Sequence, residues 1–83
     1  MMVIDEIKSL LGQTLRLGDK INQIDAKTAL FGGIPEFDSM AVVTVITAIE
    51  DRFGIVIEDD EITAEVFDTV GSLAKFIEGK LAS

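Results

Sequence analysis

A serine directly after an aspartate, at the predicted start of a helix, is the residue of this chain with the clearest chemical potential. Asp38 is a strong N-cap residue, because its carboxylate accepts hydrogen bonds from the unpaired amides of a first helical turn. Ser39 then lies at the helix N-terminus. The sequence contains neither histidine nor cysteine, which excludes triads with either residue and standard zinc sites. Ser39 is therefore not expected to act as a nucleophile by itself.

The carboxylates do not predict a catalytic or metal site. The run Glu58-Asp59-Asp60-Glu61 lacks the alternating ligand spacing and the turn glycine of a calcium loop. A solvated helix start is the favoured interpretation of this run. A small enzyme with acidic residues as acid and base is disfavoured, since no two carboxylates are placed around an apolar pocket. We predict no catalytic residue and no metal ligand.

Apolar residues recur at helical spacing in three segments. The first segment carries apolar residues at steps of three and four, Val3, Ile7, Leu10, Leu11 and Leu15. It predicts an amphipathic helix that ends near Leu17-Gly18, where glycine suits a C-terminal cap. The second helix is predicted to run from Asp38-Ser39 to about Phe53 and to stop at Gly54. The third begins at Asp68-Thr69, and its inward-facing residues are predicted to be Val70, Leu73, Phe76 or Ile77, and Leu81.

The helix predicted after Asp38 has two distinct faces. At 100° per residue, one apolar stripe is assigned to the core and a mostly polar strip to the solvent. The core stripe comprises Val42, Ile46, Ile49 and Phe53, with Val45 beside it. The exposed strip comprises Met40, Thr44, Thr47 and Asp51.

The connections between these helices complete the predicted fold. A long connection over residues 19–37 is expected to pack over the core through the apolar residues Ile21, Ile24, Leu30, Phe31 and Ile34. Ile55-Val56-Ile57 predicts an extended crossover that buries Ile55 and Ile57, and a short helix begins at Glu58. The prediction is an all-α fold, a small four-helix bundle of three main helices and one short helix, with a long loop between helices one and two. Residues 1–83 are expected to form one domain.

Charge and hydropathy restrict the location and the partners. The chain has 15 acidic and 7 basic residues, a net charge of −8, which repels nucleic acid and favours partners with basic patches. The N-terminus lacks the features of a signal peptide, and no apolar stretch is long enough to cross a bilayer. We expect a cytoplasmic monomer that binds no nucleic acid and does not insert stably into membranes. Charge alone is equally consistent with an acidic protein that simply stays soluble.

The most specific pattern is Glu36-Phe37-Asp38-Ser39-Met40-Ala41-Val42-Val43, continued by Ile46, Ile49-Glu50-Asp51 and Phe53-Gly54-Ile55. It resembles the acyl carrier family, in which Asp-Ser-Leu or Asp-Ser-Met at the start of the second helix precedes an apolar stripe, an acidic pair and Phe-Gly-Ile. The first helix, the long loop and the run Thr69-Val70-Gly71-Ser72-Leu73 also match. The resemblance therefore spans nearly the whole chain.

This resemblance implies a carrier and not an enzyme. In the family, a separate phosphopantetheinyl transferase attaches 4′-phosphopantetheine from coenzyme A to the serine, which by position is Ser39. The thiol of the arm then holds acyl or aminoacyl groups as thioesters between a loading enzyme and downstream synthases with basic patches, as in fatty acid biosynthesis. A phosphodiester on Ser39 suits a helix N-terminus. The resemblance assigns partner recognition to Asp38, Met40, Glu50 and Asp51.

Two departures from the family pattern leave the pathway open. Ala41 and Thr44 stand where typical fatty-acid carriers have acidic residues, and the approach over residues 31–37 is longer than usual. They favour a specialised carrier for polyketide, aminoacyl (including D-alanyl) or envelope-polymer assembly. The alternative of another class is a non-covalent acidic helical interaction module, in which Ser39 is an ordinary helix residue.

The interior is a further candidate site, for the acyl cargo. As in related carriers, it could open to hold an acyl chain, although a closed aliphatic core is favoured for the unloaded chain. The residues predicted to line it are Val43, Ile46, Ile55, Ile57, Ile62 and Phe67.

Overall fold

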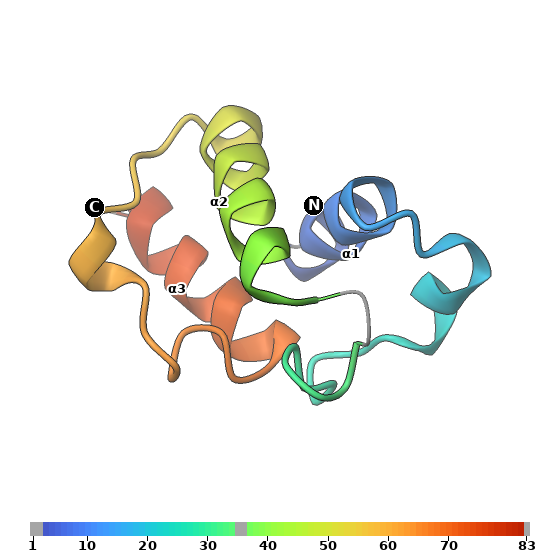
Figure 1. Cartoon of the computed structure of the whole chain (residues 1–83). Helices are drawn as coiled ribbons and strands as arrows, with labels where there is room; N and C mark the ends of the chain where they lie inside the picture. Colours follow the sequence, from blue (N-terminus) through green and yellow to red (C-terminus); the bar gives the residue numbers. More distant parts are fainter. Residues whose placement is uncertain (1–2, 35–36, 83) are drawn as a thin grey trace.

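The computed structural model describes residues 3–34 and 37–82, and over these residues the fold is all-α. The α-helices are α1 (Val3–Thr14), α2 (Ser39–Phe53) and α3 (Val70–Ala82). Two 3₁₀ helices accompany them, η1 (Gly18–Gln23) and η2 (Asp59–Glu61). The three α-helices surround a common core, with the long α1–α2 connection across one end (Figure 1). The helix α1 packs against both α2 and α3 and so links the other two α-helices of the bundle. The predicted fold class is confirmed, and η1 within the long loop is an addition to it.

The end of α1 differs from the prediction. The helix stops at Thr14, and the turn is made by Arg16, whose φ of 54° is left-handed. The Leu17 amide donates to the Gly12 carbonyl at 3.0 Å, the long-range bond of a Schellman-type end, and Leu17 is buried as such ends require. The expected glycine cap at Gly18 is therefore wrong, because a non-glycine residue takes the left-handed position two residues earlier.

The buried face of α2 is rotated slightly from the predicted stripe. Val45 and Ile49 are fully buried and mark its centre, with Ala41 and Ile46 also buried. Val42 and Phe53 were predicted to be core residues, but they lie half-buried at the edge of this face. The predicted end of the helix is confirmed: Gly54 adopts φ 66° and its amide donates to the Glu50 carbonyl at 2.9 Å.

The long connection is held against the start of α3. The Leu30 amide donates to Asp68, and the amides of Val70 and Gly71 donate back to the connection, at 2.8–3.1 Å. This pairing centres on an isolated antiparallel bridge between Ala29 and Thr69. The expectation that the loop packs over the core is confirmed for the buried residues Ile24, Leu30 and Ile34 and the half-buried Ile21.

Phe31 departs from that expectation. Its side chain is 50% exposed, and its ring contacts Phe37 edge-to-face with centroids 4.8 Å apart. The residues that follow Phe31 form a tight turn, in which Gly32 has φ 84°. Phe31 therefore covers the buried Phe37 from outside instead of filling the core.

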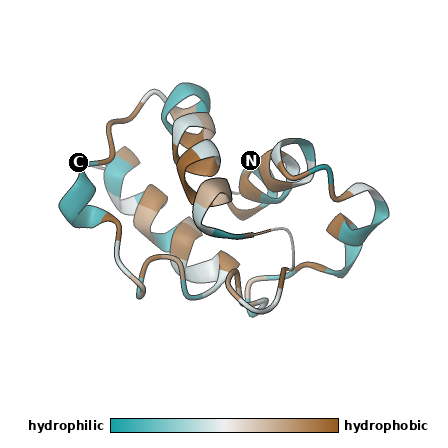
Figure 2. Ribbon diagram, viewed as in Figure 1, coloured by the Kyte–Doolittle hydropathy of each residue, from teal (hydrophilic) through white to brown (hydrophobic). Residues whose placement is uncertain are grey.

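The α2–α3 connection and α3 follow the predicted pattern with two exceptions. Ile57 is buried as expected, whereas Ile55, which was also expected to be buried, is half-buried. In α3, Val70, Leu73 and Ile77 are buried, but Leu81 is 46% exposed because it lies at the end of the helix. Figure 2 shows the apolar residues of the helices turned toward one another and hydrophilic residues gathered on η1, η2 and the last turns of α2.

Candidate functional site

The site centres on the junction between an extended residue and the first residue of α2. Asp38 has φ −117° and ψ −172°, and its carboxylate accepts a hydrogen bond from the Ala41 amide at 2.9 Å. The predicted N-cap is confirmed. Ser39 is the first residue of the helix and is exposed. Its hydroxyl is therefore accessible to another protein at a helix terminus.

The first turn of α2 has amides available for an anion. A helix leaves its first amides without intrahelical acceptors, and the Asp38 carboxylate takes only that of Ala41. The amides of Ser39 and Met40 have no acceptor among the described residues. These amides and the helix dipole favour a negatively charged group on the Ser39 oxygen. A phosphodiester at Ser39 fits this environment.

Aromatic packing fixes the position of this junction. Phe37, two residues before Ser39, is buried, and its amide donates to the Ile34 carbonyl at 2.9 Å. Its ring stacks on Phe67 with centroids 6.1 Å apart. Glu36, part of the sequence pattern, lies outside the described residues. Ser39 is thus presented to solvent by a segment anchored in the core.

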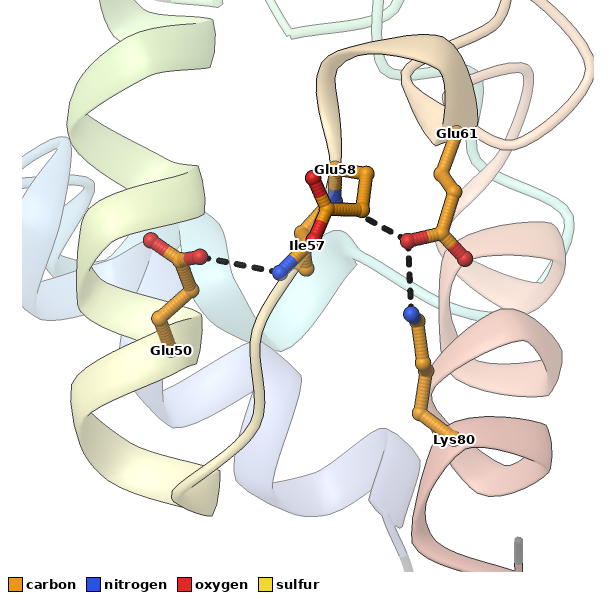
Figure 3. A network of polar contacts seen from close by, with 5 residues as sticks. All are labelled: Glu50, Ile57, Glu58, Glu61 and Lys80. Atoms are coloured by element: carbon orange, nitrogen blue, oxygen red, sulfur yellow. Dashed lines mark hydrogen bonds and ion pairs between the residues drawn. The ribbon is translucent and has the colours of Figure 1, made fainter.

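The four residues predicted to recognise partners lie at two ends of α2. Asp38 and Met40 flank Ser39, and the Met40 side chain is 81% exposed. Glu50 and Asp51 are ten or more residues further along, about 15 Å away at 1.5 Å per residue. Asp51 is exposed, whereas Glu50 is half-buried and its carboxylate accepts the Ile57 amide at 2.9 Å (Figure 3). Glu50 therefore holds the crossover in place.

Comparison with known proteins gives a consistent result. Residues 5–77 match the family model described as phosphopantetheine attachment site. The chain is 35% identical to an acyl carrier protein of Sulfurovum sp. strain NBC37-1 over 94% of this chain and 97% of that one. It is also 35% identical to acyl carrier protein 3 of Ralstonia nicotianae over 98% and 87% of the two chains. The chain belongs to the acyl carrier protein family.

The fold comparison supports the same assignment. The solution NMR structure of a holo acyl carrier protein from Nitrosomonas europaea superposes on the whole chain with a TM-score of 0.92 and 47% identity, covering all of both chains. This acyl carrier protein is therefore a carrier of acyl thioesters on 4′-phosphopantetheine and not a catalyst. Its partners include a phosphopantetheinyl transferase and acyl-handling enzymes. No helix among the described residues has the length and hydropathy needed to span a membrane.

Two residues used in the sequence argument have a different environment in the structure. Ala41 is buried, so the absence of an acidic residue at this position does not change the charge of the exposed face of α2. Of the two departures on this helix, only Thr44 makes the exposed face less negative than in typical fatty-acid carriers. Val43 was predicted to line the interior, but it is 66% exposed. It falls outside the core because the buried face of α2 is centred on Val45 and Ile49. Of the other predicted lining residues, Ile46, Ile57 and Phe67 are buried in the core cluster.

The acidic run at η2 serves the fold. The Glu58 amide donates to Glu61 Oε1 at 2.9 Å, and Lys80 Nζ in α3 lies 2.6 Å from the same oxygen (Figure 3). The hydrogen bond from Lys80, and then the amide of Glu58, lower the pKa of Glu61 below its ordinary value of 4.5. The described residues contain no group of acidic side chains that could hold a metal ion.

Sequence reasoning missed the ion pairs between elements. Arg52 in α2 pairs with Glu6 in α1 at 2.6 Å, and Lys80 pairs with Glu61 at the same distance. The hydrogen bond between Glu50 and the Ile57 amide was also missed. The partners are 46, 19 and 7 residues apart in the sequence, and no helical or strand periodicity links them. Only the packed arrangement of the helices reveals them.

Proposed function

We propose that Ser39 carries the phosphopantetheine arm of this acyl carrier protein and that residues 1–83 form one carrier domain. The observation that carries the proposal is an exposed hydroxyl at the N-terminus of α2, beside two amides without acceptors in the described chain. The span matched by the phosphopantetheine attachment model includes this position. The thiol of the arm supplies the chemistry of thioester formation.

The residues of the chain itself bind and present the arm. The amides of Ser39 and Met40 favour the phosphodiester, and the Asp38 carboxylate keeps the first turn of α2 intact through the Ala41 amide. No histidine is available to deprotonate Ser39, so the base for attachment belongs to the transferase. This division of labour suits a protein that delivers a reactive group to many enzymes and transforms none itself.

The partners and the setting form a second part of the proposal. Asp38, Met40 and Asp51 are exposed around and beyond Ser39, and we assign partner recognition to them, together with the less accessible Glu50. The net charge of −8 suits a cytoplasmic monomer that meets enzymes with basic patches around their active sites. The uncharged Thr44 on the exposed face favours enzymes of a dedicated pathway over the housekeeping fatty acid synthase.

The test is the intact mass of the chain after incubation with coenzyme A and a broad-specificity phosphopantetheinyl transferase. We expect wild type to gain one phosphopantetheine per chain and Ser39→Ala to gain none while keeping its helical circular dichroism. Ser9→Ala, which removes an exposed hydroxyl from α1, is the matched control and should be modified like wild type. A wild-type chain that gains no mass, or an Ser39→Ala chain that does, contradicts the proposal and favours a non-covalent interaction module.

A further inference from the structure

A cavity of about 270 Å³ lies under the long α1–α2 connection, between η1 and the turn at residues 31–34. Its apolar lining is formed by Leu17, Ile24 and Ile34, which are all buried. Polar side chains, among them Gln23 and Thr28, also line it. Figure 1 shows η1 and the turn on the same side of the molecule, at the end where α2 begins. An apolar lining with a few polar groups is typical of sites for small ligands.

The two walls of this cavity are anchored on different helices. On the η1 side, Ile21 packs over Gly12 of α1, where a Cβ would lie 3.3 Å from Ile21 Cδ1. On the other side, the Leu30 amide donates to the Asp68 carbonyl at 3.1 Å, beside the bridge that ties the connection to the start of α3. Because each wall is held from outside, the space between them does not depend on contacts across it.

Ser39 is close enough to the cavity for a group attached to it to enter. The Phe37 amide donates to the Ile34 carbonyl at 2.9 Å, which places the two Cα atoms within about 7 Å of each other. Ser39, two residues further, adds at most about 7 Å. The phosphopantetheine arm has about fourteen bonds between the serine oxygen and its sulfur, and these extend over about 16 Å. The thiol end of the arm can therefore reach the lining residue Ile34.

The volume of the cavity restricts what it can hold. An apolar protein cavity of about 150 Å³ binds benzene, so a volume of about 270 Å³ accommodates roughly eleven non-hydrogen atoms. The cysteamine end of the arm with an acyl group of about four carbons is of this size. An acyl chain of about twelve carbons is too large. The cavity thus suits short acyl groups.

The helical core, by contrast, is closed around the residues that were predicted to line a cargo site. Ile46, Ile57 and Phe67 are all buried and belong to the packed core cluster. An acyl group that enters there must displace packed side chains, which destabilises the fold. The cavity beside η1 is already open and requires no such displacement.

The polar lining also matches the chemistry of the arm. The carboxamide of Gln23 has no hydrogen-bond partner among the described residues, and it offers both an acceptor and donors. The arm contains two amides with the same kinds of group. In addition, a group on a short flexible linker has an effective concentration in the millimolar range. A site that binds a free ligand weakly is therefore occupied by a tethered one.

We infer that the cavity between η1 and the turn at residues 31–34 binds the thiol end of the arm together with an acyl group of about four carbons or fewer. The inference rests on the proposed attachment at Ser39 and names the class of cargo that this carrier holds. A short acyl group is then removed from solvent in the loop region, while the core between the helices stays closed.

The first test places the cargo directly. A broad-specificity phosphopantetheinyl transferase and butyryl-coenzyme A load the chain, and NMR is recorded on a sample with labelled methyl groups. We expect nuclear Overhauser effects from the butyryl methyl group to Leu17, Ile24 and Ile34. Contacts to core residues such as Ile57 instead, or to neither set, overturn the inference.

The second test blocks the cavity. Gln23 is exposed, so Gln23→Trp adds a large side chain to the lining without removing a buried group. We expect hydroxylamine to cleave the butyryl thioester at least about twofold faster in this variant than in wild type, because the occupied cavity shields the thioester. Asn22→Trp is the matched control, since Asn22 is exposed on η1 but does not line the cavity. The inference is overturned if Gln23→Trp is cleaved like wild type or like Asn22→Trp.

A third test separates the cavity from the attachment. S-butyryl-N-acetylcysteamine, the untethered end of the same group, is titrated into the Ser39→Ala chain. It should shift the methyl signals of Leu17, Ile24 and Ile34 with a Kd of about 1–10 mM, and the absence of these shifts overturns the inference. Failure of wild type to gain phosphopantetheine would instead overturn the attachment at Ser39, so the two failures are distinguishable.

Discussion

The proposed attachment at Ser39 needs little chemistry from the carrier's own residues. The hydroxyl is exposed, the adjacent amides favour an anion, and the neighbouring carboxylate of Asp38 is engaged with the Ala41 amide. A nucleophilic serine would need a base within hydrogen-bond reach, and the chain has no histidine. The absence is useful, because an arm that delivers thioesters must not be attached to a protein that cleaves them.

Among the glycines, Gly33 is the one where an added Cβ would approach the backbone most closely. A Cβ at this position would clash with the Ala29 carbonyl oxygen, in the segment that pairs with the start of α3. Because the clash is with backbone, relief requires the turn before Ile34 to move. We predict that Gly33→Ala lowers the free energy of unfolding by about 2 kcal/mol or more, in the range of overpacking, measured by urea denaturation.

The matched control for Gly33 is another glycine with free space around it. A Cβ on Gly79 in α3 meets nothing within 4 Å, and alanine is favoured over glycine in a helix by up to about 1 kcal/mol. Gly79→Ala should therefore keep or raise the stability. Equal destabilisation by both alanines would show that the close approach of Gly33 to Ala29 is not what requires glycine there.

At the scale of elements, a side-chain hydrogen bond ties the crossover between α2 and α3 to α2. The Ile57 amide belongs to a buried residue in a segment with no strand partner among the described residues, and the Glu50 carboxylate is its acceptor at 2.9 Å. We predict that Glu50→Ala lowers the free energy of unfolding by about 1–3 kcal/mol, the cost of an unsatisfied buried donor. Amide exchange at Ile57 should accelerate in the same variant.

Two further variants separate this hydrogen bond from charge. Glu50→Gln keeps an acceptor oxygen and should retain most of the stability. Asp51→Ala removes an exposed neighbouring carboxylate and should change the stability by less than about 0.5 kcal/mol. If Asp51→Ala were as destabilising as Glu50→Ala, charge at the end of α2 would be responsible, and the hydrogen bond would not.

The elements also show what the sequence could predict. The start and end of α2 follow from Asp38 and Gly54, since a cap and a left-handed glycine act locally. The end of α1 was misplaced because Arg16, a residue without a turn preference, adopts φ 54°. Val42 and Phe53 were misplaced because periodicity gives the width of an apolar face but not its rotation, which packing against other elements decides. Long-range contacts such as Arg52–Glu6 leave no local signal at all.

At the scale of the whole molecule, the excess of acidic residues lowers the stability of the folded chain, and two ion pairs between elements oppose this effect. A net charge of −8 on 83 residues destabilises a compact chain through self-repulsion. The pairs Arg52–Glu6 and Lys80–Glu61 place two of the seven basic residues where they join separate elements, α2 to α1 and α3 to η2. The scarce positive charges thus link parts of the fold while most acidic residues remain on the surface.

The Lys80–Glu61 pair makes a defined contribution to the pH dependence of stability. The pKa of Glu61 is lowered in the folded chain from 4.5, chiefly by the hydrogen bond from Lys80. A carboxylate with a lowered pKa stabilises the fold above its unfolded pKa, and this contribution disappears as the pH falls through the folded value. We therefore predict that Lys80→Gln is less stable than wild type at pH 7 and that the difference narrows below about pH 4.

The comparison needs a control for charge, because Lys80→Gln also makes the chain more negative. Lys27→Gln removes the same charge from an exposed residue of the long connection, and its effect is subtracted. Lys80 also lies over the Phe76 ring at 5.8 Å, but that contact does not titrate in acid. The quantity compared is the free energy of unfolding of Lys80→Gln minus that of Lys27→Gln. Only the part of this difference that disappears at low pH measures the contribution of the Lys80–Glu61 pair. A difference between the two variants that stays constant from pH 7 to about pH 3 would show that Lys80 acts through contacts that do not titrate in acid, such as the one with Phe76.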